Sequence, residues 1–231
     1  LNAGNYTALI KYLGNDNYAE SNTTVNFTVR KHNSTTSASI ANITYGVNIT
    51  VNITVNGVDG TDLSGNVTVN IGQSSWNGIV DSTGVGNVNL GILDVGNYTA
   101  EVKYLGNNNY AGSNTTTQFI ITKSNSTTVG TIANITYGEN ATVNVNVTGV
   151  NGEGLDGNVT ITVNNQNYNI VLNNGVGSVN VPDLNAGNYT ALIKYLGNDN
   201  YAGSNITVIF TVRKHNSTTG ASIANITYGE N

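Results

Sequence analysis

The chain has 231 residues and a formal net charge of −5; only 9% of its residues are charged, and it contains no cysteine. The charges form no basic run, which argues against a nucleic-acid or anionic-membrane partner, and no apolar run is long enough for a membrane helix. Without cysteine, each domain must be stable without disulfides, and Cys-based metal sites are excluded.

One stretch of the chain occurs three times. The sequence LDVGNYTAEVKYLG at residues 93–106 recurs as LNAGNYTALIKYLG at residues 1–14 and 184–197. Successive copies begin 92 and 91 residues apart, so the chain is a tandem array of units of about 91 residues. Within the middle copy, Tyr98, Ala100, Val102 and Tyr104 alternate with polar residues. This alternation predicts a half-buried β-strand that is entered through a glycine turn.

The first complete unit predicts seven short strands and no helix. The clearest strand is VNITVNITV at residues 47–55, where Val and Ile alternate strictly with Asn and Thr. Asn makes up about a fifth of the chain, and this interleaving favours folded sheet over the disorder that Asn-rich chains can show. The seven strands are expected at residues 36–45, 47–55, 66–71, within 72–84, 85–90, 93–106 and 115–122.

Turn signals about every ten residues between short alternating strands are typical of an antiparallel sandwich. We therefore predict an all-β chain of tandem Ig-like antiparallel β-sandwich domains of about 91 residues, arranged as a rod. The connectors at residues 27–37 and 119–128 contain neither Gly nor Pro, which favours a rod over freely hinged domains.

The period also predicts where the units begin and end. We expect two complete Ig-like domains and a fragment of a further unit on each side, completed by neighbouring units or copies, because a lone hairpin is marginal in water. The divisions are 1–33 for the last two strands of a preceding unit, 34–125 and 126–216 for the complete domains, and 217–231 for the first strand of a following unit.

The recurring motif resembles bacterial-type Ig-like repeats of group 3. The residues that carry this resemblance in the middle copy are Gly96, Tyr98, Tyr104, Gly106, Asn109, Tyr110 and Ala111. The Asn- and Thr-rich sequence around them is similar to that of adhesin-like surface proteins of methanogenic archaea. The resemblance implies an Ig-like fold and an extracellular, cell-surface location, and it says little about biochemical activity.

The Gly-x-Tyr entry to the repeated strand matches a tyrosine corner, in which the hydroxyl bonds to backbone a few residues upstream. Tyr6, Tyr98 and Tyr189 occupy this position. The alternative is a platform on which sugars stack. The alternation directs these rings inward, which favours the structural role.

The triplet Asn-x-Thr, the acceptor sequence for N-glycosylation, occurs 19 times and never has Pro in the middle. Strands that alternate Asn and Thr on one face produce such triplets automatically. Composition alone would give about nine, so the excess predicts N-linked glycans. The candidate acceptors are Asn5, Asn22, Asn26, Asn33, Asn42, Asn48, Asn52, Asn66, Asn97, Asn114, Asn125, Asn134, Asn140, Asn146, Asn158, Asn188, Asn205, Asn216 and Asn225.

Two segments, residues 68–96 and 160–187, contain no acceptor triplet. They hold Trp76, Ile79 and Tyr168, large apolar residues in a chain that would otherwise be covered by glycans. We hypothesise that these segments form a bare strip through which chains touch laterally.

Catalytic and metal sites have little support in the sequence. His32 and His215 are the same position in two copies and have no Cys partner, so neither a catalytic nor a zinc role is expected. Lys103 is directed outward, which argues against a buried isopeptide crosslink. No cofactor is therefore expected, with calcium as the less favoured alternative. Its candidate ligands are Asp59 and Asp62 in one loop and Glu153 and Asp156 in the matching loop.

These observations favour a structural protein over an enzyme. We expect a spacer or stalk in an N-glycosylated adhesin-like fibre or filament at the cell surface. Its partners would be neighbouring repeats, further copies of the same chain, and other cells or surfaces. The alternative is an adhesin module that binds glycans or a surface directly through loops such as residues 57–65. That loop and its counterpart are small, polar and without aromatic residues, which favours the spacer.

Overall fold

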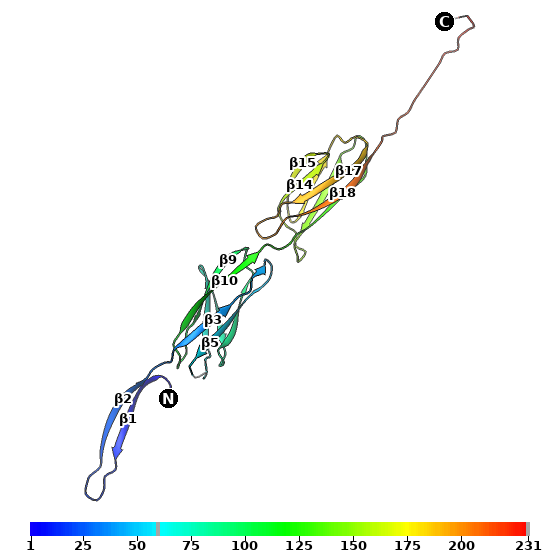
Figure 1. Cartoon of the computed structure of the whole chain (residues 1–231). Helices are drawn as coiled ribbons and strands as arrows, with labels where there is room; N and C mark the ends of the chain where they lie inside the picture. Colours follow the sequence, from blue (N-terminus) through cyan, green and yellow to red (C-terminus); the bar gives the residue numbers. More distant parts are fainter. Residues whose placement is uncertain (59–60, 230–231) are drawn as a thin grey trace. The chain divides into compact units, whose positions relative to one another are not determined.

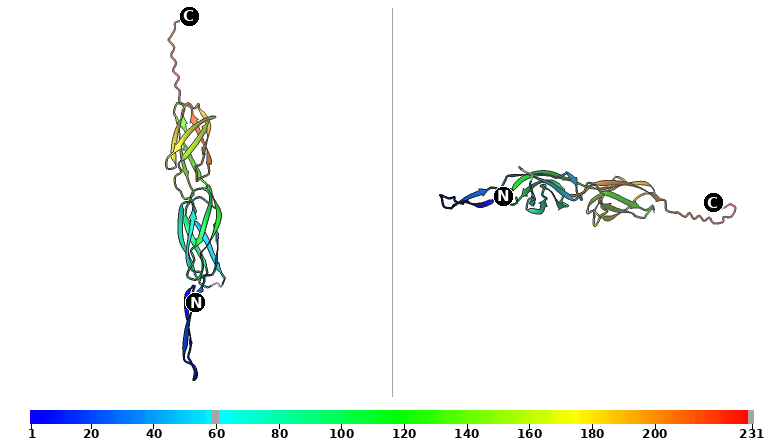
Figure 2. Two further views of the ribbon diagram at one scale, coloured as in Figure 1. Left: turned by 90° about the vertical axis from the view of Figure 1, so that its left-hand side faces the viewer. Right: turned by 90° about the horizontal axis from the view of Figure 1, so that it is seen from below.

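A computed structural model of the chain describes residues 1–58 and 61–229, and these residues form strands, turns and loops without a helix. The chain divides into two compact units, Leu1–Lys123 and Ser124–Asn231. Each unit contains one complete two-layer β-sandwich, which is drawn in Figures 1 and 2. The prediction of tandem Ig-like sandwiches is confirmed.

The first sandwich consists of a three-stranded sheet in the order β3-β5-β8 and a five-stranded sheet in the order β4-β10-β9-β6-β7. All pairings are antiparallel except that of β4 with β10, which is parallel. The strands are β3 (Ser34–Ser39), β4 (Ile43–Thr44), β5 (Ile49–Gly57), β6 (Gly65–Ile71), β7 (Ser74–Val80), β8 (Val85–Gly91), β9 (Gly96–Tyr104) and β10 (Ser113–Thr122).

The second sandwich repeats the first strand for strand. Its sheets have the orders β11-β13-β16 and β12-β18-β17-β14-β15, and β12 pairs in parallel with β18. The strands are β11 (Thr127–Ile132), β12 (Ile135–Thr136), β13 (Ala141–Thr148), β14 (Gly157–Val163), β15 (Gln166–Leu172), β16 (Val176–Val181), β17 (Gly187–Tyr195) and β18 (Ser204–Arg213).

The first predicted strand of each domain is in fact two strands in different sheets. Residues 36–45 were expected to be continuous, but β3 lies in the small sheet and β4 in the large one. The chain crosses between sheets at Asn42, whose Oδ1 accepts a hydrogen bond of 2.8 Å from the backbone N–H of Ile120 on β10. Asn134 does the same for Thr211, at 2.7 Å. The side-chain amide therefore supplies a partner that the interrupted ladder lacks.

Alternation along the strands places the core between the two sheets. In β5, the side chains of Ile49, Val51, Ile53 and Val55 are no more than 1% exposed, while the residues between them face outward. Val47 was predicted to continue this inward face, but it precedes the strand and is exposed. Burial of each such aliphatic side chain stabilises the domain by about 1.5–3 kcal/mol, so the core accounts for the sandwich.

The chain before the first sandwich forms a hairpin of β1 (Gly4–Tyr12) and β2 (Ser21–Val29). Its register, with Gly4 opposite Val29, is that of β17 and β18, where Gly187 lies opposite Val212. The hairpin thus has the register of the last strand pair of a sandwich. Its apolar side chains, among them Phe27, are largely exposed.

The predicted first strand at residues 217–231 does not form in the described part, residues 217–229, which is exposed and without strand pairing. In the first sandwich the equivalent segment is held by β5 and β10. No described strand follows β18, so this segment has no equivalent partners within its unit. Residues 230 and 231 lie outside the described residues.

Two glycines of the first sandwich have a positive φ but differ in how closely other backbone atoms approach them. Gly84 has φ +81°, and a Cβ there would overlap the carbonyl oxygen of Val55, whose N–H donates to the Gly84 carbonyl at 2.8 Å. Gly72 has φ +58° and open space around it. We expect Gly72→Ala to destabilise the domain by about 1 kcal/mol, and Gly84→Ala by at least twice that. Equal losses in urea unfolding would contradict this close approach.

Candidate functional site

Each copy of the repeated motif contains a tyrosine that anchors the loop before its strand. The hydroxyl groups of Tyr6, Tyr98 and Tyr189 donate to the carbonyl oxygens four residues upstream, at 2.6, 2.8 and 3.0 Å. Each ring also stacks on a Phe of the neighbouring strand, for Tyr98 at 5.3 Å from Phe119. Burial, together with the Asp94 carboxylate, raises the pKa of Tyr98, which keeps the phenol protonated as a donor. These are the features of a tyrosine corner rather than of a sugar platform.

The turn between the last two strands is organised by an Asn and a buried Tyr that the sequence reasoning did not single out as anchors. In the first domain, Asn107 Oδ1 accepts hydrogen bonds of 2.9 Å from the N–H groups of Asn109 and Tyr110. Its Nδ2 donates to the carbonyl oxygens of Asp62 and Ser64 at 2.8 and 3.0 Å. One side chain thus ties this turn to the loop before β6. The spacing Gly-Asn-x-Asn-Tyr-Ala, which is part of the family resemblance, is the sequence signal that could have identified these two residues as anchors.

The chain that enters each sandwich is bonded to the same turn. The N–H of His32 donates to the Asn109 carbonyl, and its carbonyl accepts from the N–H of Ala111, both at 2.8 Å. In the second domain, Ser124 makes the equivalent pair with Asn200 at 3.0 Å and Ala202 at 2.8 Å. His32 therefore has a backbone role that serine can fill equally well. His215 is exposed, with Nδ1 3.0 Å from its neighbour's carbonyl oxygen.

The pair of backbone bonds at His32 or Ser124, here called the entry bridge, marks where the chain enters a sandwich. The end of the last strand marks where the chain leaves it. In the first domain the bridge lies at Tyr110, just before β10, and the chain leaves the domain after β10 ends at Thr122. A strand of 10 residues spans about 33 Å at about 3.3 Å per residue. The second domain has the same arrangement, from Ser124 beside Tyr201 to the end of β18. Entry and exit thus lie at opposite ends of each sandwich.

The described carboxylates that were considered as calcium ligands accept hydrogen bonds from protein groups. Asp62 Oδ1 accepts from the N–H and hydroxyl of Ser64 at 3.2 and 2.6 Å, and these bonds lower its pKa. Asp156 Oδ1 accepts from the N–H of Asn174 at 2.6 Å. Glu153 accepts from the Tyr201 hydroxyl and, at 3.0 Å, from the N–H of Asn151. The bonds of Ser64 and Asn151 form turns, whereas those of Asn174 and Tyr201 join separate loops; Asp59 lies outside the described residues.

Within residues 1–58 and 61–229, no three His, Cys, Asp or Glu side chains gather in a group that could hold a metal ion. Lys103 pairs with Glu101 on the outward face of β9, at 2.9 Å. The described part of the chain also has no helix long and apolar enough to cross a membrane.

The Asn side chains of all 19 acceptor triplets are exposed. Several take part in the fold through Oδ1 only: besides Asn42 and Asn134 at the sheet crossings, Asn26 accepts from the Thr7 hydroxyl at 2.7 Å and Asn188 from the Thr211 hydroxyl at 2.9 Å. The nitrogen that would carry a sugar is Nδ2, so these bonds leave the acceptor atom unused.

The two segments without acceptor triplets follow one side of each sandwich. In the first domain they include β7 and β8, the edge strands of the large and small sheets, which lie next to each other. The equivalents in the second domain are β15 and β16. Trp76 and Tyr168 face inward and are half buried, and Trp76 packs against the core. The strip is therefore less aromatic than the sequence indicated, and its exposed large apolar residues in the first domain are Ile79, Val85 and Ile92.

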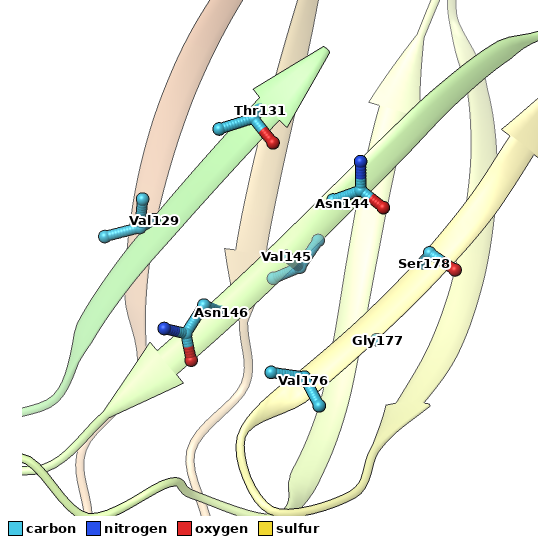
Figure 3. A pocket seen from close by; sticks show the side chains of 8 residues that line it. All are labelled: Val129, Thr131, Asn144, Val145, Asn146, Val176, Gly177 and Ser178. Carbon is cyan, nitrogen blue, oxygen red and sulfur yellow. The ribbon is translucent and has the colours of Figure 1, made fainter.

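An open trough of about 430 Å³ lies on the outward face of the small sheet of the second domain. Figure 3 shows its lining, with Val129, Asn146 and Val176 on three adjacent strands and Thr131, Asn144 and Ser178 beside them. The lining contains neither an acid nor a base, so it has no group for proton transfer.

Two-layer sandwiches with these strand orders and a tyrosine corner define the chain as a tandem array of Ig-like domains. Residues 124–213, which include the second sandwich, match the model of the bacterial Ig-like domain (group 3). The first sandwich has the same strand order and sheet partners, so it is a copy of the same unit.

The chain is similar to several solved structures of bacterial proteins. Invasin, a bacterial integrin-binding protein, matches with a TM-score of 0.50 and 20% identity over 77% of this chain and 39% of invasin. The Yersinia pseudotuberculosis adhesin InvE matches with a TM-score of 0.35 and 14% identity, over 78% of this chain and 58% of InvE. The chain thus spans less than half of the invasin structure. The similarity to invasin shows the fold alone, and a comparison with curated proteins finds no match.

The Glu153 loop predicts a pH dependence for the second domain. The hydrogen bond from Tyr201 holds the pKa of the Glu153 carboxyl below its ordinary value of 4.5. Because the folded pKa is the lower one, Glu153 stabilises the domain above the unfolded pKa, and this contribution is lost as the pH falls through the folded pKa. We expect the difference in urea midpoint between wild type and Glu153→Gln to be largest at pH 7 and to shrink below 4.5.

Tyr201→Phe removes the donor and should reduce the same pH dependence. A difference between wild type and Glu153→Gln that stays constant from pH 7 to pH 3 would show that the carboxylate contributes nothing to this loop.

Proposed function

We propose that this array is a structural spacer in an extracellular, adhesin-like surface protein. The observation that carries the proposal is the position of entry and exit at opposite ends of each sandwich, fixed by the bridges at His32 and Ser124. Each added domain then extends the chain by about the length of its last strand instead of folding it back. The Ig-like fold that the domains share with bacterial adhesins supports this role.

The outward faces support the glycosylation of this spacer. Charged residues are only 9% of the chain, so N-linked glycans on the exposed acceptor Asn residues would supply the solubility that charge does not. A glycosyltransferase would deliver the sugar from a lipid-phosphate-linked oligosaccharide. The Asn Nδ2 forms a bond to sugar C1 and loses a proton, while the C1–O bond breaks and the lipid phosphate leaves with the electron pair.

The side without acceptor triplets supports lateral contact between copies. The opposite side carries Asn42 beside β4 in the first domain and Asn134 beside β12 in the second, both exposed. Glycans there would shield one edge of each sandwich, whereas β7, β8, β15 and β16 would stay open for pairing. A filament of the kind suggested by the resemblance to archaeal surface proteins would then assemble through one edge only.

Direct recognition of a ligand by the loops has weaker support. The loop at residues 149–157 is held over the core by Glu153 and Tyr201, and the loop before β6 is held by Asn107. The polar groups of Asn107 and Glu153 are thus engaged in holding the loops in place.

The spacer proposal predicts how size grows with repeat number. For chains of one, two and four repeats, the maximum dimension from small-angle X-ray scattering should rise by at least about 33 Å for each repeat. An increment that falls steadily as repeats are added would indicate free hinges between domains and would contradict the proposal.

Lateral contact through the bare edge can be tested with charge. Lysines at Ser75 and Asn77 on β7 should oppose strand addition at that edge and raise the concentration needed for self-association at least about tenfold, equivalent to 1.4 kcal/mol. The matched control places lysines at Ser37 and Ser39 on β3, an edge strand on the other side of the sandwich, where they leave every acceptor triplet intact. Analytical ultracentrifugation that shows equal effects, or no association of the unchanged chain, would exclude this edge.

A further inference from the structure

Three cross-strand rows on the outward faces have an exposed aliphatic side chain at both flanks. On the small sheet of the second domain, Val129 lies opposite Asn146 on one side, and Val176 lies opposite it on the other. Figure 3 shows the two valines on either side of the Asn146 amide. Outward positions elsewhere on these strands are mainly Asn, Thr and Ser, so the valines interrupt a polar surface.

The same arrangement occurs on the large sheet of both domains. In the first, Ile79 lies opposite Asn66, whose carbonyl accepts a hydrogen bond of 3.0 Å from the N–H of Leu105. The six flanking aliphatic side chains are 47–74% exposed. The equivalent row in the second domain is Val171, Asn158 and Leu196.

The residue in the middle of each such row is an acceptor Asn. Neighbouring rows centred on Thr68, Asn144 and Thr160, which are not acceptors, have polar residues at both flanks. Rows centred on the non-acceptors Thr54 and Thr162 have one aliphatic flank each, Val85 and Leu192, and a polar residue at the other flank. Strand propensity alone would not place aliphatic pairs at the acceptor rows. One further acceptor with neighbours on both sides, Asn52, has Ser39 and Asn87 there. It therefore serves as an internal contrast.

A pyranose ring has an apolar face of C–H groups and a rim of hydroxyl groups. A sugar linked to Nδ2 of Asn146 would start between the two valines, because the aliphatic groups stand one strand away on each side. We propose that Asn66, Asn146 and Asn158 carry N-linked glycans whose first sugar packs its apolar face on the flanking aliphatic pair. This inference rests on the proposed glycosylation and specifies which glycans are held against the protein.

The troughs contain the polar groups that the rim of such a sugar would require. Beside the valines of the second domain, Thr131, Asn144 and Ser178 form the next row of the same trough. A second trough of about 310 Å³ contains Asn158 together with Thr160 and Asn169. Both platforms of the second domain thus combine an aliphatic pair with hydrogen-bonding side chains, the composition typical of small-molecule sites.

The test is a mutant cycle on protein purified from a host that glycosylates it, with glycopeptide mass spectrometry to establish occupancy. We expect Asn146→Gln to lower the melting temperature of the second domain by about 4 °C, because the contact between the first sugar and the two valines is lost. A shift of this size is measurable in a domain of this length. In a Val129→Ser, Val176→Ser background, Asn146 should still carry its glycan. In that background, Asn146→Gln should lower the melting temperature of the second domain by less than about 1 °C. The control is Asn205→Gln, which removes an acceptor that lies opposite Lys194. This substitution should have little effect on the melting temperature in either background.

The outcomes separate this inference from the glycosylation on which it rests. Absence of glycan at every acceptor would overturn the proposed glycosylation itself. Glycans elsewhere with Asn146 unoccupied, or an effect of Asn146→Gln that is the same in both backgrounds, would overturn the platform alone. Serine substitutions that abolish self-association and leave the glycan effect unchanged would show that the valines bind another protein copy.

Discussion

The pairing of the last two strands in each domain, β9 with β10 and β17 with β18, determines where most other elements lie. The tyrosine corner opens this pair, and the ring stack closes one end of it. The turn that joins the strands binds the chain entering the domain, and the last strand accepts the short parallel strand β4 or β12 on its free side. The core, the point where the chain enters a domain and the point where it leaves therefore all depend on one hairpin. This dependence explains why the sequence of the hairpin recurs with few changes.

This dependence separates the two kinds of surface in a domain. The inward face and both ends are determined by packing and by bonds that join one loop to another, as at Asn107 and Glu153. The outward faces have no such requirement, and they contain Asn and Thr in alternation with few charges. A change of outward residues therefore alters what the repeat contacts without altering the fold. The equivalent residues Thr54 and Asn146 illustrate this, since their flanks are Ser37 and Val85 in the first domain and Val129 and Val176 in the second.

The sequence was most informative where a strand has one buried face. The period of two in residues 47–55 predicted β5 and its core side chains, and the motif at 93–106 predicted β9. Residues 36–45 lack a clear period because the chain changes sheets at Asn42, and the bond to Ile120 that permits this is long-range. Tyr110 lies in a turn, where periodicity gives no signal. The rows around Asn146 depend on strand register, which one sequence does not reveal.

The parallel pairing of β4 with β10 has a mechanical consequence. When the chain is pulled from both ends, β4 is drawn toward its beginning and β10 toward its end, so the two strands are loaded in shear. The backbone bond from Tyr45 to Thr122 and the side-chain bond from Ile120 to Asn42 share that load and must yield together instead of one after another. Each domain thus resists tension at the junction where its first strand changes sheets.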